Sequence, residues 1–108
     1  MTLPQDRRFE PRSAANTRAV VVAPGLELSC LIIDHSATGL RLRLDRNLAL
    51  PGQVQVIDPA RAVALEVDVV WRKGQEVGLK QRGVASLRGL IPSRLSAARA
   101  AFLRAGGR

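Results

Sequence analysis

The sequence predicts an all-β fold, a six-stranded antiparallel β-barrel with one C-terminal helix. Polar and apolar residues alternate over several short segments, which is the pattern of strands with one buried face. Glycine and proline separate these segments, and no helical period lies between them. At 108 residues, the chain fits one domain with a core of its own.

The strands are expected at 17–22, 27–33, 40–44, 53–57, 62–72 and 77–80. The turn signals between them are Pro24-Gly25, Pro51-Gly52, Asp58-Pro59 and Lys73-Gly74-Gln75. In the second strand, alternation turns Leu28, Cys30 and Ile32 inward, so Cys30 is expected as a small core residue and not as a reactive thiol.

The third and fifth strands show the clearest alternation. Leucines at positions 40, 42 and 44 share one face of the third strand, and Arg41 and Arg43 share the other. On the fifth strand the same period predicts an inward row and places Glu66 and Asp68 outside. The inward row comprises Val63, Leu65, Val67, Val69 and Trp71.

The last part of the chain has helical character. Pro92-Ser93 is a helix start signal, and Gly106-Gly107 is a stop signal. One face of this helix carries Leu95, Ala98, Ala101 and Phe102. The helix is expected to cover a mouth of the barrel or a partner, with core packing as the default. The expected organisation is a flexible arm at 1–16, a barrel domain at 17–82 and a C-terminal segment at 83–108.

Composition limits the classes of partner and of chemistry that are expected for the chain. The net charge of +8 favours an anionic partner. A metal site or a catalytic triad is not expected, because His35 and Cys30 are the single residues of their kinds and have no supporting spacing. No strand-to-helix glycine cluster forms a phosphate loop. No enzyme activity and no metal are therefore expected. His35 is expected to face solvent or to pack in a turn.

The location of the protein is expected to be the cytoplasm. The N-terminus lacks the apolar region of a signal peptide. No apolar run approaches the roughly 20 residues that cross a bilayer, so no membrane contact is expected.

Two polar segments carry binding chemistry. The first is Arg7-Arg8-Phe9-Glu10-Pro11-Arg12, whose guanidiniums suit phosphate, carboxylate or a guanine edge. The second is Asp34-His35-Ser36-Ala37-Thr38-Gly39, a turn in which the Asp34 carboxylate suits the donor edge of guanine. A solvated basic tail and a purely structural turn are the alternative interpretations of the two segments.

Together these segments resemble the PilZ domain, the bacterial receptor module for cyclic di-GMP. Arg8 to Arg12 matches the family's RxxxR arm, and Asp34 to Gly39 matches its [D/N]xSxxG turn. The family's Val-x-Trp strand corresponds to Val69-Val70-Trp71, and the glycine that follows corresponds to Gly78. The resemblance covers the chain up to about Gln81.

The resemblance implies a six-stranded barrel that holds cyclic di-GMP on its outer surface. In that case Arg8 and Arg12 clamp phosphates and guanines with help from Arg7, and Asp34, Ser36 and Gly39 grip a guanine. Strand alternation adds outward-facing Arg41, for which a solvated surface arginine is an equal alternative. These ligand-binding candidates are Arg7, Arg8, Arg12, Asp34, Ser36, Gly39 and Arg41.

The expected function is a stand-alone cyclic di-GMP receptor or adaptor that signals by ordering of the arm. It needs no cofactor besides this ligand, acts on an unidentified protein partner, and is a monomer or a weak homodimer. One alternative is a small barrel that binds nucleic acid, which the shortage of aromatic residues disfavours. The other is a PilZ-like module that contacts proteins and binds no ligand.

Overall fold

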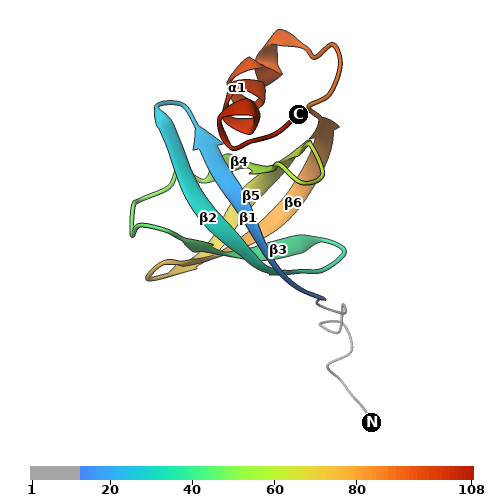
Figure 1. Ribbon diagram of the computed structural model, residues 1–108. Coiled ribbons are helices and arrows are strands. Elements are labelled where there is room, and N and C mark those ends of the chain that lie inside the picture. Colours follow the sequence, from blue (N-terminus) through green and yellow to red (C-terminus); the bar gives the residue numbers. More distant parts are fainter. Residues whose placement is uncertain (1–12) are drawn as a thin grey trace.

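The computed structural model describes residues 13–108, and side chains from Ala15 onward. Figure 1 shows a barrel with a helix beside one end of it. None of the helices in this part of the chain is both long and apolar enough to span a bilayer.

Six antiparallel strands close into a barrel, which confirms the predicted fold class. The strand order is β1-β2-β3-β6-β5-β4, and pairing of β4 with β1 closes the ring. The bounds are β1 (Ser13–Ala23), β2 (Leu26–His35), β3 (Gly39–Leu44), β4 (Gln53–Asp58), β5 (Val63–Lys73) and β6 (Glu76–Ser86).

The barrel interior is filled by aliphatic side chains, as alternation predicts. Leu28, Cys30 and Ile32 of β2 are buried, and so are the three leucines of β3. Val56 of β4 and Val67 of β5 complete the same cluster. The leucine face of β3 and the inward set of β2 are therefore confirmed.

Two strands extend past their predicted ends. The first begins at Ser13 and not at Thr17, because Asn16 adopts a left-handed conformation (φ 49°). There a bulge lets pairing continue from Thr17↔Ile32 to Ala14↔Asp34. The last strand reaches Ser86, beyond the expected residues 77–80 and past residue 82. A bulge beside Arg82 interrupts its alternation, which hides the continuation from a period-two pattern.

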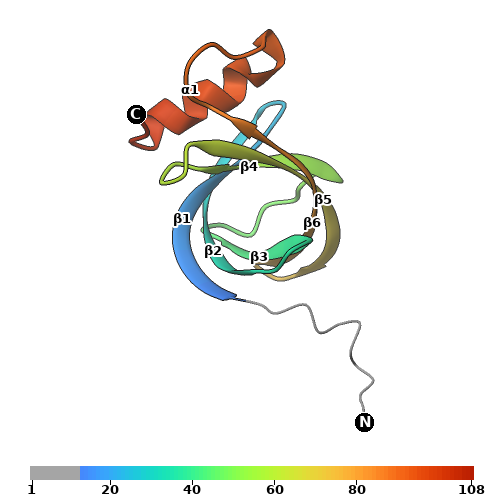
Figure 2. The same ribbon diagram turned by 90° about the vertical axis from the view of Figure 1, so that its right-hand side faces the viewer.

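The C-terminal helix packs on the side wall of the barrel, so the prediction that it covers a mouth is wrong. A 3₁₀ turn, η2 (Ser93–Leu95), leads into α1 (Ser96–Arg104). Figure 2 shows α1 outside the ring of strands. The reason is a second apolar cluster on the outer faces of β1, β4 and β5. It joins Val20, Val22, Ile57 and Ala64 to Ala98, Ala101 and Phe102.

Buried side chains and one ion pair fix α1 to the barrel. All four residues of the predicted helical face, Leu95, Ala98, Ala101 and Phe102, are buried. Arg104 donates to the carboxylate of Glu27 on β2, and this hydrogen bonding lowers the pKa of Glu27. Gly106 (φ 91°) ends the helix, and the Gly107 N–H donates to the Phe102 carbonyl at 2.9 Å.

Candidate ligand-binding site

A bulge in β2 turns Asp34 to the outside of the barrel. Ile32 pairs with Leu42, whereas Asp34 pairs with Arg41, so Ile33 is the extra residue. Without it, Asp34 would follow Ile32 into the core, because side chains alternate along a strand. The extra residue reverses the alternation and places Asp34 opposite outward-facing Arg41.

A second bulge does the same for Trp71 in β5. Val69 pairs with Leu79, and Trp71 pairs with Gly78, which leaves Val70 as the extra residue. The prediction that Trp71 continues the inward row is therefore wrong. Its side chain lies on the outer face and is 43% exposed.

The two bulges align one residue from each of four strands. Asp34 is paired with Arg41, Arg41 with Gly78, and Gly78 with Trp71. A groove of about 530 Å³ lies along this row on the barrel surface. It is lined by Asp34, Ser36, Thr38, Gly39, Leu40, Arg41, Val70, Trp71, Gly78, Leu79 and Lys80.

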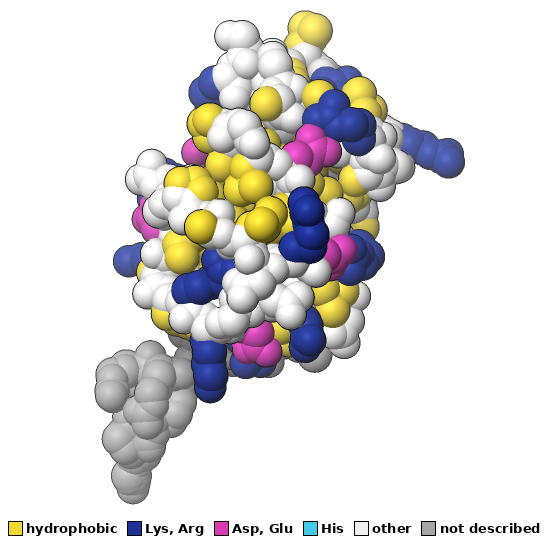
Figure 3. Space-filling model, turned by 90° about the vertical axis from the view of Figure 1, so that its left-hand side faces the viewer, with side chains coloured by type: hydrophobic (Ala, Val, Ile, Leu, Met, Phe, Trp, Pro, Cys, Tyr) yellow, Lys and Arg dark blue, Asp and Glu magenta, His cyan; other side chains and the backbone are white. Residues whose placement is uncertain are grey.

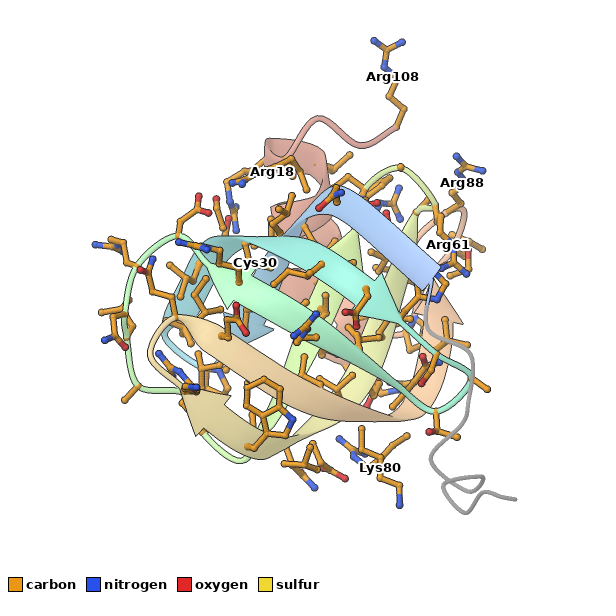
Figure 4. The ribbon with its side chains drawn as sticks, turned by 90° about the horizontal axis from the view of Figure 1, so that it is seen from below. Arg18, Cys30, Arg61, Lys80, Arg88 and Arg108 are labelled. Carbon is orange, nitrogen blue, oxygen red and sulfur yellow. The ribbon has the colours of Figure 1, made fainter. Side chains whose placement is uncertain are left out.

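The groove thus brings together Asp34, Ser36, Gly39 and Arg41, all four predicted site residues in the described part of the chain. Neither Lys80 nor Val70 is a predicted site residue. Lys80 is paired with Gly39, and its side chain projects into solvent (Figure 4). Val70 reaches the groove through the bulge in β5, which period-two alternation does not contain, and Lys80 reaches it through the pairing of β6 with β3, which the sequence of a single strand does not show.

The turn between β2 and β3 is closed by backbone hydrogen bonds. The Ser36 N–H donates to the Gly39 carbonyl at 2.8 Å, and the Gln81 N–H donates to the Thr38 carbonyl at 2.8 Å. A Cβ at position 39 would overlap the carbonyl oxygen of Leu79. Gly39 is therefore required by close strand packing as well as by its place in the groove.

Asp34 and Arg41 form an ion pair at one end of the row. Arg41 Nε and Nη2 donate to the same oxygen, Asp34 Oδ2, at 3.1 and 2.7 Å. The Asp34 side chain is only 12% exposed, and that of Arg41 is 40% exposed. Arg41 Nη1 also lies 3.9 Å from Oε1 of Glu76 on β6. The guanidinium thus lies between two carboxylates and covers one side of Asp34.

The arginines of the RxxxR segment, Arg7, Arg8 and Arg12, lie outside the described residues. The start of β1 is nevertheless fixed, because Ser13 pairs with His35 and Ala14 pairs with Asp34. Arg12 directly precedes Ser13 in the chain. The segment that carries the arginines therefore joins the barrel beside the turn at Asp34.

Cys30, the single cysteine of the chain, is unsuited to nucleophilic chemistry. Cys30 is fully buried within the barrel, as expected, and burial raises the pKa of its thiol to about 12 (Figure 4). His35 is exposed, as expected. Within residues 13–108, no cluster of three or more His, Cys, Asp or Glu side chains is arranged to hold a metal ion.

Charge on the described surface is mixed. Several arginines are paired with carboxylates, among them Arg18 with Asp45 and Arg82 with Asp68. On the face that Figure 3 presents, Lys and Arg side chains are spread among Asp and Glu side chains. This face therefore carries no continuous basic stripe of the kind that follows a nucleic-acid backbone.

Comparison with known proteins identifies one family. The model of the PilZ domain matches residues 6–89, more than half of the chain. The match includes both the arginine segment and the turn at Asp34, and it ends before η2 and α1. No curated protein matches the chain.

Proposed function

Because the chain belongs to the PilZ domain family, whose members generally bind cyclic di-GMP, we propose that it is a receptor or adaptor for this dinucleotide. The ligand lies in the outer groove, between the turn at Asp34–Gly39 and the arginines that precede β1. In this proposal the protein is a binding module and not an enzyme.

The register of β1 on β2 is the observation that carries this proposal. Ser13 and Ala14 pair with His35 and Asp34, so the arginine segment joins the barrel at the groove. Arg12 directly precedes Ser13 in the chain, so only a few residues separate the arginine segment from the groove. The two halves of the family pattern, far apart in sequence, then act on one ligand.

The groove supplies chemistry that suits guanine. The Asp34 carboxylate accepts hydrogen bonds from the N1–H and the exocyclic amine of the base. Ser36 adds a hydroxyl, and Gly39 gives the base access to the backbone. Arg8 and Arg12 pair with the phosphates and with O6 and N7 of the second guanine, assisted by Arg7.

Binding also provides a signal. Fixing the arm against the turn costs about 1–2 kcal/mol per residue in backbone entropy. Charge-assisted hydrogen bonds contribute roughly 1.5–3 kcal/mol each. Several such bonds must form together to offset this cost. A ligand with two guanines and two phosphates supplies them, and it holds the arginine arm against the turn at Asp34–Gly39. The closed arm then presents a new surface to a downstream protein.

Calorimetric titration with cyclic di-GMP, cyclic di-AMP and GTP tests the proposal. We expect saturable binding of cyclic di-GMP and at least about tenfold weaker binding of the other two, because adenine lacks the donor edge for Asp34 and GTP lacks the second guanine. An equal response to all three nucleotides would reduce the groove to a general anion site.

Substitution of the arm arginines tests whether they bind the ligand. Arg8→Ala and Arg12→Ala should each abolish measurable binding and leave the circular dichroism of the barrel unchanged. Arg18→Ala is the matched control, because Arg18 is an exposed arginine of β1 that pairs with Asp45 away from the groove. Full affinity in the Arg8 and Arg12 variants would refute a role for the arm.

A further inference from the structure

We infer that Asp34 and Arg41 form a guanine-reading pair that separates to admit the base and then binds two of its edges. Asp34 accepts from N1–H and the exocyclic amine, and Arg41 donates to O6 and N7. This inference rests on the proposed function and adds a specificity determinant from β3, outside the arginine arm.

The first support is the way in which Arg41 uses its donors. Nε and Nη2 both point to a single oxygen of Asp34. A guanidinium fork fits two acceptors side by side better than one. The O6 and N7 atoms of guanine offer such a pair, so the same two donors gain a second acceptor when the base replaces Asp34 Oδ2.

The second support is access to Asp34. With its side chain 12% exposed, Asp34 presents little of its carboxylate to the groove, whereas the Arg41 side chain above it is 40% exposed. A base that binds Asp34 from the groove must therefore displace Arg41. Because the base then bonds to both Asp34 and Arg41, neither charge is left unpaired, and an unpaired charge is what makes breaking a buried ion pair costly.

The third support is that Arg41 has a second carboxylate beside it. Its Nη1 lies 3.9 Å from Glu76 Oε1 on β6, the neighbouring strand. The Glu76 carboxylate therefore attracts the guanidinium toward β6 while Nε and Nη2 turn to the base.

The pair discriminates between bases because Asp34 is a hydrogen-bond acceptor and Arg41 is a donor. Guanine offers donors to Asp34 and acceptors to Arg41 at the same time. Adenine presents an amine where Arg41 needs O6, and it lacks the N1–H that Asp34 needs. Adenine therefore cannot replace the bonds that the largely buried Asp34 carboxylate makes with Arg41, which makes opening of the pair for adenine unfavourable.

The test is a cycle that combines Arg41→Ala with removal of guanine N7. Calorimetry compares cyclic di-GMP with its 7-deazaguanine analogue, in which both N7 atoms are replaced by C–H. We expect Arg41→Ala to weaken cyclic di-GMP binding about tenfold and binding of the analogue at most about twofold. Equal losses for the two ligands, or tighter binding by the variant, would overturn the inference.

Two further variants keep the test decisive. Arg43→Ala is the matched control, because Arg43 also faces outward on β3 but lines a separate hollow with Arg18 and Asp45; it should change neither affinity. Arg41→Gln serves if the alanine variant does not fold, and it should show the same coupling to N7. If the wild-type protein does not bind cyclic di-GMP, the proposed function fails first. Binding without coupling to N7 rejects only the role of Arg41.

Discussion

The indole ring of Trp71 lies against the Cα of Gly78, on the outer face of the barrel. The two residues are paired across β5 and β6, and a Cβ at position 78 would overlap the indole ring. Because Gly78 has no side chain, the indole ring can occupy this position. This position leaves Trp71 half exposed beside Asp34 and Arg41, in the same groove.

Replacing Gly78 with alanine should displace this ring. We expect Gly78→Ala to lower the free energy of unfolding by about 1–3 kcal/mol, as overpacking does elsewhere. Because Trp71 is the single tryptophan, the shift of its emission maximum reports the displacement directly. The same variant should also weaken the binding of cyclic di-GMP.

Gly83→Ala is the matched control for this change. Gly83 lies on the same strand, and a Cβ there meets no atom within 4 Å. Its emission spectrum and stability should match those of the wild type. A Gly78 variant that behaves like the Gly83 variant would show that Trp71 does not depend on Gly78 for its position.

Gly39→Ala should be more damaging than Gly78→Ala. Its Cβ would meet the carbonyl oxygen of Leu79, which belongs to the backbone of β6 and cannot rotate away. We expect a loss of about 3 kcal/mol in urea unfolding, with opening of the first β3–β6 pair, Gly39↔Lys80. Gly52→Ala is the control, since a Cβ there meets open space. Equal stability of the two variants would contradict the close approach of these strands.

Alternation was sufficient to predict six strands and an aliphatic interior. It correctly turned Cys30 inward and Arg41 outward, because neither residue follows an irregularity in its own strand. It failed at Trp71, where the extra residue Val70 reverses the alternation. Nothing in the sequence around Val70 marks a bulge, since valine is a typical strand residue.

Motif spacing named the candidate residues, and the resemblance implied a ligand on the outer surface, but the backbone geometry that turns Asp34 outward was not predicted. The family pattern named Asp34, Ser36 and Gly39 but gave no reason for Asp34 to leave the core face of β2. That reason is the bulge at Ile33, which depends on pairing with β3. The side-wall position of α1 was also missed, because it depends on outward apolar residues such as Val20 and Ile57 that a barrel alone does not need.

The helix should be an integral part of the fold. Phe102 is 1% exposed against the outer wall of β1 and β4, whereas its neighbour Leu103 is 53% exposed. We expect Phe102→Ala to lower the free energy of unfolding by about 3–5 kcal/mol and Leu103→Ala to change it by about 0.5 kcal/mol. Chemical denaturation measures both. Similar small effects would mean that α1 is dispensable for stability.

The buried thiol of Cys30 should make stability fall at high pH. Burial raises its pKa from 9.0 to about 12, so the folded state keeps a proton that the unfolded chain releases. The protonated thiol makes its full contribution to the free energy of unfolding below pH 9. This contribution falls by about 1.4 kcal/mol per pH unit as the pH rises toward 12. Urea unfolding between about pH 8 and pH 10.5 measures this slope.

Cys30→Ala separates the thiol from other groups that titrate in this range. The variant should be less stable throughout, because it leaves a small cavity, but its slope above pH 9 should be shallower than that of the wild type. Parallel slopes for the two proteins would mean that Cys30 does not supply the pH dependence.

Salt dependence should distinguish a dinucleotide receptor from a nucleic-acid binder. A net charge of +8 attracts any polyanion, but five of the described arginines are engaged with carboxylates, as in Arg18–Asp45 and Arg82–Asp68. Cyclic di-GMP has two phosphates, so its affinity should fall with a log–log slope of about −2 or shallower. A single strand that releases counterions from six phosphates would give about −4.

Titrations followed by Trp71 fluorescence between about 50 and 300 mM KCl measure both slopes. If an oligonucleotide bound more tightly than cyclic di-GMP at the higher salt concentration, nucleic acid would be the better candidate for the natural ligand.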